Sequence, residues 1–67
     1  MNEDIFKGKW NQFKGQAKHT WGNLTDSDIA RAEGSYDEFV GILQERYGWE
    51  RSRAEQEVEN FFELQKW

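Results

Sequence analysis

The segment KWNQFKGQAKHTWGNLTDSD, residues 9–28, decides the fold because it carries aromatic residues at helical spacing up to a capped turn. On one helix, begun a few residues earlier, the apolar side chains fall within an arc of about 80°. They are Phe6, Trp10, Phe13, Ala17 and Trp21. An arc of this width is typical of the buried stripe of an amphipathic helix, so these rings are predicted to form the core.

Glycines recur in the same segment at Gly8, Gly15 and Gly22, although glycine is a poor helix former. The helical wheel places all three about 160–200° from Phe6, away from the apolar stripe. Gly22 is expected to be a left-handed C-terminal cap, and Gly8 lies near the helix start. Gly15 costs about 0.5–1 kcal/mol relative to alanine. Two explanations remain open: Gly15 tolerates a bend or break of the helix, or its bare backbone lets a partner helix or a second copy approach closely.

Three further helices are predicted from capping residues and apolar periods. Each begins at a Ser or Thr followed three positions later by an acidic residue, which is a capping box. The three boxes are Thr25 with Asp28, Ser35 with Glu38, and Ser52 with Glu55. Asn2 is the expected N-cap of the first helix. The second helix is predicted over residues 26–33, and Gly34 and Gly48 are expected to end the second and third helices.

The third and fourth helices each present one apolar face. These faces contain Tyr36, Phe39, Val40, Leu43 and Tyr47 in the third helix, and Ala54, Val58, Phe61 and either Phe62 or Leu64 in the fourth. Proline is absent, and no alternation of apolar and polar residues is long enough to indicate a strand. The fold class is therefore predicted to be all-α, with four helices in one domain over residues 1–67.

Composition narrows the possible functions. Among 67 residues there is no cysteine, which excludes disulfides and thiolate metal sites. No signal peptide or membrane span is apparent, so a cytoplasmic location is expected. Residues 1–24 carry four lysines and two acidic residues, net +2, whereas residues 25–67 carry five basic and eleven acidic residues, net −6. This asymmetry favours steering of partners or head-to-tail association, and the total of −4 argues against general binding of polyanions.

No constellation of residues indicates catalysis or metal binding. The single histidine, His19, has no cysteine nucleophile to activate and is interpreted as a surface residue. Asp26 and Asp28 match the first two positions of a calcium loop, but the required glycine and closing glutamate are missing. The glutamates of the fourth helix point in several directions and are typical of a solvated face. No enzyme activity, cofactor, metal or small-molecule substrate is therefore predicted.

The remaining positive feature is a basic strip of Lys7, Lys14 and Lys18, which share an arc of about 40° beside the aromatic stripe. Lysines beside aromatic residues are consistent with weak nucleic-acid binding, but three lysines make few phosphate contacts. The preferred interpretation is that their stems cover ring edges while the charges stay in water. Together with Gly15 they are the candidate contact residues for an unknown protein partner or for self-association; no membrane contact is expected.

Two blocks in the first third of the chain, WNQFKG at residues 10–15 and WGNLTD at residues 21–26, resemble the signature of the CsbD-like family of small bacterial stress-response proteins. Later blocks, including QERYG at residues 44–48, are also similar to that family. The resemblance implies a cytoplasmic protein induced under general stress, with no known cofactor and a small orthogonal helical array similar to SAM-like or helix-hairpin-helix folds. The predicted function is a non-enzymatic stress-response protein that acts by protein contact or as an abundant hydrophilic protectant; the alternative is a weak nucleic-acid-binding module.

Overall fold

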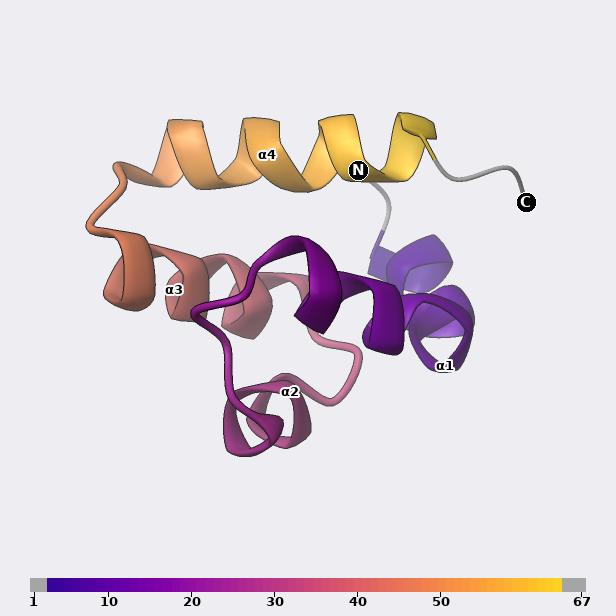
Figure 1. Ribbon diagram of the computed structural model, residues 1–67. Helices are drawn as coiled ribbons and strands as arrows, with labels where there is room; N and C mark the ends of the chain where they lie inside the picture. Colours follow the sequence, from indigo (N-terminus) through magenta and orange to yellow (C-terminus); the bar gives the residue numbers. More distant parts are fainter. Residues whose placement is uncertain (1–2, 65–67) are drawn as a thin grey trace.

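The computed structural model describes residues 3–64, which fold into four α-helices. They are α1 (Glu3–Thr20), α2 (Asp26–Ala32), α3 (Tyr36–Tyr47) and α4 (Arg51–Leu64). In Figure 1, α3 and α4 run across the view as a hairpin, and α2 is seen nearly end-on on the far side of α3 from α4. The described residues contain four helices and no strand, so the prediction of a small all-α fold is confirmed.

The predicted apolar stripe of α1 is the centre of the core. All five of its residues are buried, and its rings meet aromatic residues of α3 and α4. The ring centroids of Phe13 and Phe62 are 4.8 Å apart, and those of Trp21 and Phe61 are 4.9 Å apart. Phe39 of α3 contacts three rings on or next to α1. Edge-to-face and tilted pairs of this kind hold the helices together in place of a larger aliphatic core.

The predicted faces of α3 and α4 agree with the structure except at two positions. Ile42 is buried although it was not assigned to the apolar face of α3. Leu64 is 79% exposed, so Phe62 is the residue that packs against the core at the end of α4. Tyr36 and Tyr47 lie at the edges of the α3 face and are partly buried.

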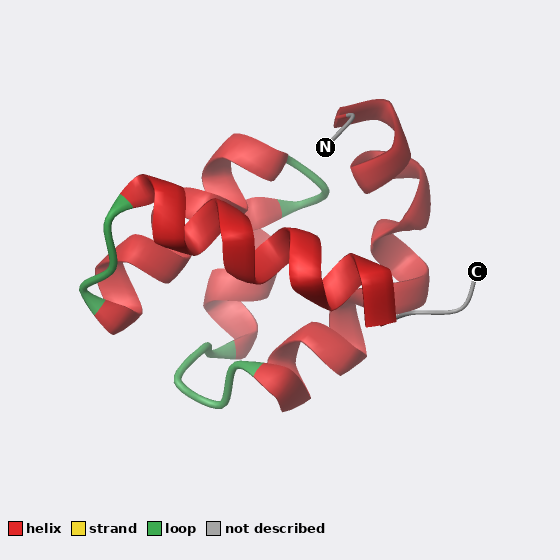
Figure 2. Cartoon of the chain, turned by 90° about the horizontal axis from the view of Figure 1, so that it is seen from above, coloured by secondary structure: helices red, strands yellow, loops and turns green. Residues whose placement is uncertain are grey.

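Helix α1 is continuous through Gly15, which excludes a break at that residue. The helix does bend along its course, and its two ends point in different directions in Figure 2. The prediction that Gly22 is a left-handed cap is wrong, because the positive φ angles of the described glycines occur at Gly34 and Gly48. After Thr20 the chain leaves α1 through a turn in which the Leu24 N–H donates to the Trp21 carbonyl at 3.0 Å. The predicted cap Asn2 lies outside the described residues.

The capping box of α2 is present as predicted. The Asp28 N–H donates to the Thr25 hydroxyl, and the Thr25 N–H donates to the Asp28 carboxylate, both at 3.1 Å. Helix α2 ends at Ala32, and Glu33, rather than the following glycine, is the left-handed C-cap, with φ 43°. Gly34 follows with φ 80°, where an added Cβ would stand 3.4 Å from the Lys7 side chain. Glycine is thus required here by its backbone conformation and by the close approach of α1.

The caps of the later helices depart from prediction at their N-terminal ends. Ser35 accepts a hydrogen bond from the Glu38 N–H at 3.4 Å, so the serine half of that box forms. The box predicted at Ser52 is wrong, because α4 begins at Arg51 and Ser52 lies inside its first turn. The side chain of Glu55 instead pairs with Arg51, at 3.0 Å. Gly48 is the left-handed cap of α3, as predicted.

Candidate functional site

A groove of about 620 Å³ lies between α1 and α2. The two helices run in opposite directions, since Lys18 meets Asp26 at one end of the groove and Trp10 lies beside Gly34 at the other. We call it the α1–α2 groove. It is lined by Trp10, Asn11, Lys14, Gly15 and Lys18 from α1, and by Asp26, Ile29, Ala30 and Glu33 from α2 and its cap.

The groove has an apolar floor between walls of opposite charge. Trp10, which is 8% exposed, and the partly buried Ile29 contribute apolar surface. On the walls, Lys18 and Asp26 form an ion pair across one end. Lys14 and Glu33 carry opposite charges on opposite walls, and within residues 3–64 neither makes an ion pair. Such a surface can bind a partner, but its lining residues supply no activated nucleophile.

Three of the four candidate contact residues predicted from the sequence line this groove: Lys14, Gly15 and Lys18. Lys7 does not line it; its side chain passes over Gly34, beyond the end of α2. A Cβ added at Gly15 would meet nothing within 4 Å, so the space beside this glycine is open. Their role as contact residues stays a prediction.

The residues considered for chemistry stay apart. His19 is exposed and lies outside the groove lining. Among the described residues, no three histidine, aspartate or glutamate side chains come together as a possible metal site. Asp26 and Asp28 have separate partners, Lys18 and Arg46, on different sides of α2.

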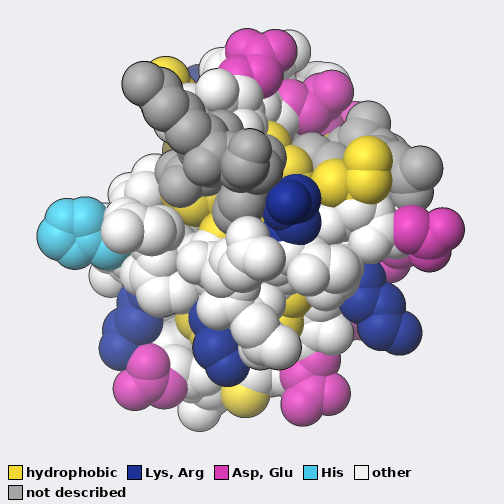
Figure 3. All heavy atoms as spheres, turned by 90° about the vertical axis from the view of Figure 1, so that its right-hand side faces the viewer, with side chains coloured by type: hydrophobic (Ala, Val, Ile, Leu, Met, Phe, Trp, Pro, Cys, Tyr) yellow, Lys and Arg dark blue, Asp and Glu magenta, His cyan; other side chains and the backbone are white. Residues whose placement is uncertain are grey.

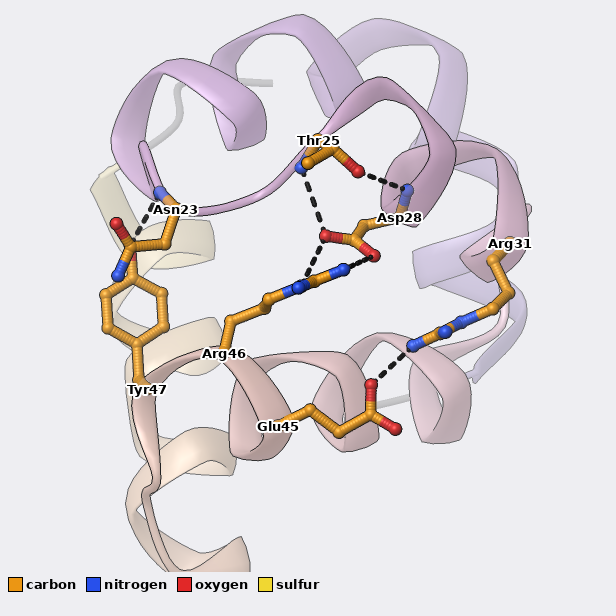
Figure 4. A network of polar contacts seen from close by, with 7 residues as sticks. All are labelled: Asn23, Thr25, Asp28, Arg31, Glu45, Arg46 and Tyr47. Carbon is orange, nitrogen blue, oxygen red and sulfur yellow. Dashed lines mark hydrogen bonds and ion pairs between the residues drawn. The ribbon is translucent and has the colours of Figure 1, made fainter.

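A partly buried ion pair between α2 and α3 was not predicted from the sequence (Figure 4). The Arg46 guanidinium donates to both carboxylate oxygens of Asp28, at 2.7 and 2.8 Å, while Thr25 donates from its backbone. The hydrogen bonds from Arg46 are the main reason that the pKa of Asp28 falls to about 2, against the opposing effect of its burial. Asp28 is only 2% exposed. Because Asp28 lies at the start of α2 and Arg46 near the end of α3, this ion pair joins the two helices.

Two weaker contacts flank this pair in Figure 4. Arg31 donates to Glu45 at 2.7 Å, and the Asn23 backbone N–H donates to the Tyr47 hydroxyl at 3.3 Å. Tyr47 also stacks on Trp49, with ring centroids 4.4 Å apart, and the Arg53 guanidinium lies 5.0 Å from the centre of the Trp49 ring. The Arg31–Glu45 pair joins α2 to α3, whereas the contacts of Tyr47, Trp49 and Arg53 hold the turn between α3 and α4.

The profile of the CsbD-like family matches residues 4–56, which make up most of this chain. This chain belongs to the CsbD-like family. A UPF0337 protein of Pseudomonas aeruginosa, PA4738, is 56% identical over 61 residues, covering 91% of this chain and 94% of the relative. The UPF0337 protein YjbJ of Escherichia coli K12 is 52% identical over 58 residues, covering 87% and 84% respectively.

These findings confirm the family that the sequence blocks indicated, and the names of these relatives state no enzymatic reaction. None of the helices within residues 3–64 of the CsbD-like chain combines the length and apolar character that a membrane crossing requires.

The basic strip of this CsbD-like chain is expected to bind nucleic acid only nonspecifically. Lys18 is already paired with Asp26, and basic and acidic side chains are interspersed on the face drawn in Figure 3. Fluorescence anisotropy with labelled DNA and RNA should give dissociation constants no tighter than about 10⁻⁴–10⁻⁶ M at physiological salt. Submicromolar binding that is lost when Lys7, Lys14 and Lys18 are all changed to Gln would contradict this prediction and favour the nucleic-acid alternative.

Proposed function

We propose that this CsbD-like chain is a cytoplasmic, non-enzymatic stress-response protein that acts by protein contact through the α1–α2 groove. The observation that carries the proposal is the open space beside Gly15 on the α1 wall of the groove. The family assignment supports a stress-response role. The lining of the groove supports a contact role, because it consists of an apolar floor and charged walls rather than reactive groups.

No steric contact within residues 3–64 requires a glycine at residue 15, although α1 bends along its course. The backbone there is helical, its φ is not positive, and an added methyl group would meet no atom within 4 Å. Alanine would fit and would favour the helix by about 0.5–1 kcal/mol. We infer that the absent side chain serves a contact outside the monomer, where it lets another backbone come close.

Protein contact and action as a hydrophilic protectant differ in how much they depend on a single surface. A protectant acts through its bulk composition and charge, which a single substitution on one helix hardly changes. A contact protein depends on the shape of one surface. The two functions therefore predict different effects of a bulky residue placed in the groove.

Gly15→Trp is expected to abolish the contact, because the indole would occupy the groove that the partner enters. Gly8→Trp is the matched control: Gly8 lies on the same helix, also in open space, but outside the groove lining. In stressed cells that lack the chromosomal copy, survival and the yield of photo-crosslinked adducts should fall with Gly15→Trp and stay at the wild-type level with Gly8→Trp.

Circular dichroism and thermal melting establish that both variants are folded before the cells are compared. Equal survival with the two variants, at the wild-type level, would show that the groove is not used and would favour the protectant. Equal loss with both folded variants would likewise contradict a contact confined to this groove.

A further inference from the structure

We propose that the partner in the α1–α2 groove is a second copy of this chain, related to the first by a two-fold axis. The inference rests on the proposed function and names the occupant of the same groove. It is carried by the charges on the two walls and by the shape of α1.

The charges are self-complementary. Lys14 stands on the α1 wall and Glu33 on the α2 wall, and neither has an ion-pair partner within residues 3–64. When α1 of one copy lies in the groove of the other, its Lys14 comes beside Glu33 of the partner subunit. A two-fold axis repeats this contact, so the dimer contains two such ion pairs.

The shape of the groove determines which element enters it. Two grooves placed face to face would leave a void, so a helix of one copy must fill the groove of the other. Helix α1 suits this position because Gly15 lets its backbone approach closely, and Ala30 on the facing wall is also small. The contact would cover the accessible edge of Trp10 and the partly buried Ile29.

The expected dimer is weak. A standard interface buries about 800 Å² per partner, which is nearly a fifth of the 4349 Å² accessible surface of the described chain. One groove and its rims supply less than this. The dissociation constant is therefore expected in roughly the 10⁻⁵–10⁻³ M range, so that association depends on how abundant the protein is.

The test is a charge exchange read by sedimentation equilibrium from about 10 µM to about 1 mM, a span chosen to bracket that range. The mass of the wild-type chain should rise toward that of a dimer as its concentration rises. Lys14→Glu and Glu33→Lys should each remain monomeric, because each places like charges opposite one another. Their equimolar mixture should associate at least as well as the wild type, because opposite charges then meet again in a heterodimer.

Glu63→Lys is the matched control for Glu33→Lys. It makes the same change in net charge at an exposed position of α4 that has no ion pair among the described residues. Glu63→Lys should leave self-association unchanged, and mixing it with Lys14→Glu should give no more dimer than Glu63→Lys gives by itself. If Glu63→Lys acted like Glu33→Lys, net charge rather than the groove would control association, and the proposal would be overturned.

A wild-type chain that stays monomeric at about 1 mM would also overturn the proposal, because that concentration is the upper end of the expected dissociation constants. So would an equimolar mixture of Lys14→Glu and Glu33→Lys that associates no more than either variant by itself. The proposed function would fail by a different result. If the wild type is monomeric but Gly15→Trp still loses survival and crosslinks, the groove binds another protein and only the second copy is excluded.

Discussion

Phe39→Ala is expected to unfold the chain at room temperature. The Phe39 ring is 1% exposed and lies 5.4–5.8 Å from the ring centroids of Phe6, Trp10 and Trp21, so it ties α3 to both ends of α1. Removing a buried phenylalanine costs about 3–5 kcal/mol. A domain of this size, with one thin core, has a free energy of unfolding of about the same magnitude.

The measurement is far-ultraviolet circular dichroism with urea and thermal unfolding. Leu64→Ala is the control, because Leu64 is an exposed apolar residue whose truncation should change the free energy of unfolding by less than about 0.5 kcal/mol. A Phe39→Ala chain with wild-type helicity and melting temperature would contradict the aromatic core described above.

Asp28→Ala is expected to lower the free energy of unfolding by about 1–2 kcal/mol at pH 7. The Thr25 hydroxyl still caps α2 through the backbone N–H of residue 28, but the hydrogen bonds that the Asp28 carboxylate accepts from Arg46 and from the Thr25 N–H are lost. The lowered pKa of Asp28 reflects these bonds together and corresponds to about 1–2 kcal/mol, once the solvent around the half-exposed Arg46 is allowed for. Urea unfolding measures the difference. Asp26→Ala is the control, since that residue has only a solvent-exposed ion pair.

The effect of Asp28→Ala should depend on pH in a defined direction. The folded chain holds the Asp28 pKa at about 2, below its ordinary value of 3.8. The stabilisation from its ionised form is therefore complete above pH 3.8 and is lost as the pH falls toward 2. The gap between wild type and Asp28→Ala should narrow over that interval. A gap that stayed constant would contradict the lowered pKa of Asp28 and the ion pair with Arg46 that is its main cause.

Much of the fold was predictable because its signals are local. The stripe from Phe6 to Trp21 and the Thr25–Asp28 box depend on residues within a few turns of one another, and both are present. The predictions of caps were wrong where a second local backbone arrangement was also available to the chain. The helix that a cap at Ser52 would begin at Arg53 begins two residues earlier, at Arg51. After α1 the chain leaves through a turn that needs no left-handed glycine at Gly22.

The candidate site was predictable only in part. Lys14, Gly15 and Lys18 could be grouped because they share one side of a single helix, but the facing wall comes from α2 and depends on how the two helices pack. The pair of Asp28 with Arg46 was missed for the same reason. Asp28 already had a local explanation as a capping residue, and nothing in the periodicity of α3 indicated that Arg46 reaches across to it.

The order in which the helices pack has a kinetic consequence. Helix α2 packs on both α1 and α3, and α3 packs on α4, so most contacts join neighbours in the chain. The ring contacts of α1 with α3 and α4 are the long-range exceptions. Helical domains with such local connectivity fold in microseconds to milliseconds. The sequence contains no proline and no cysteine, which removes the two common causes of slow refolding. A chain denatured by a passing shock of heat or acid should therefore regain its structure almost as soon as the shock ends, without help from a folding catalyst.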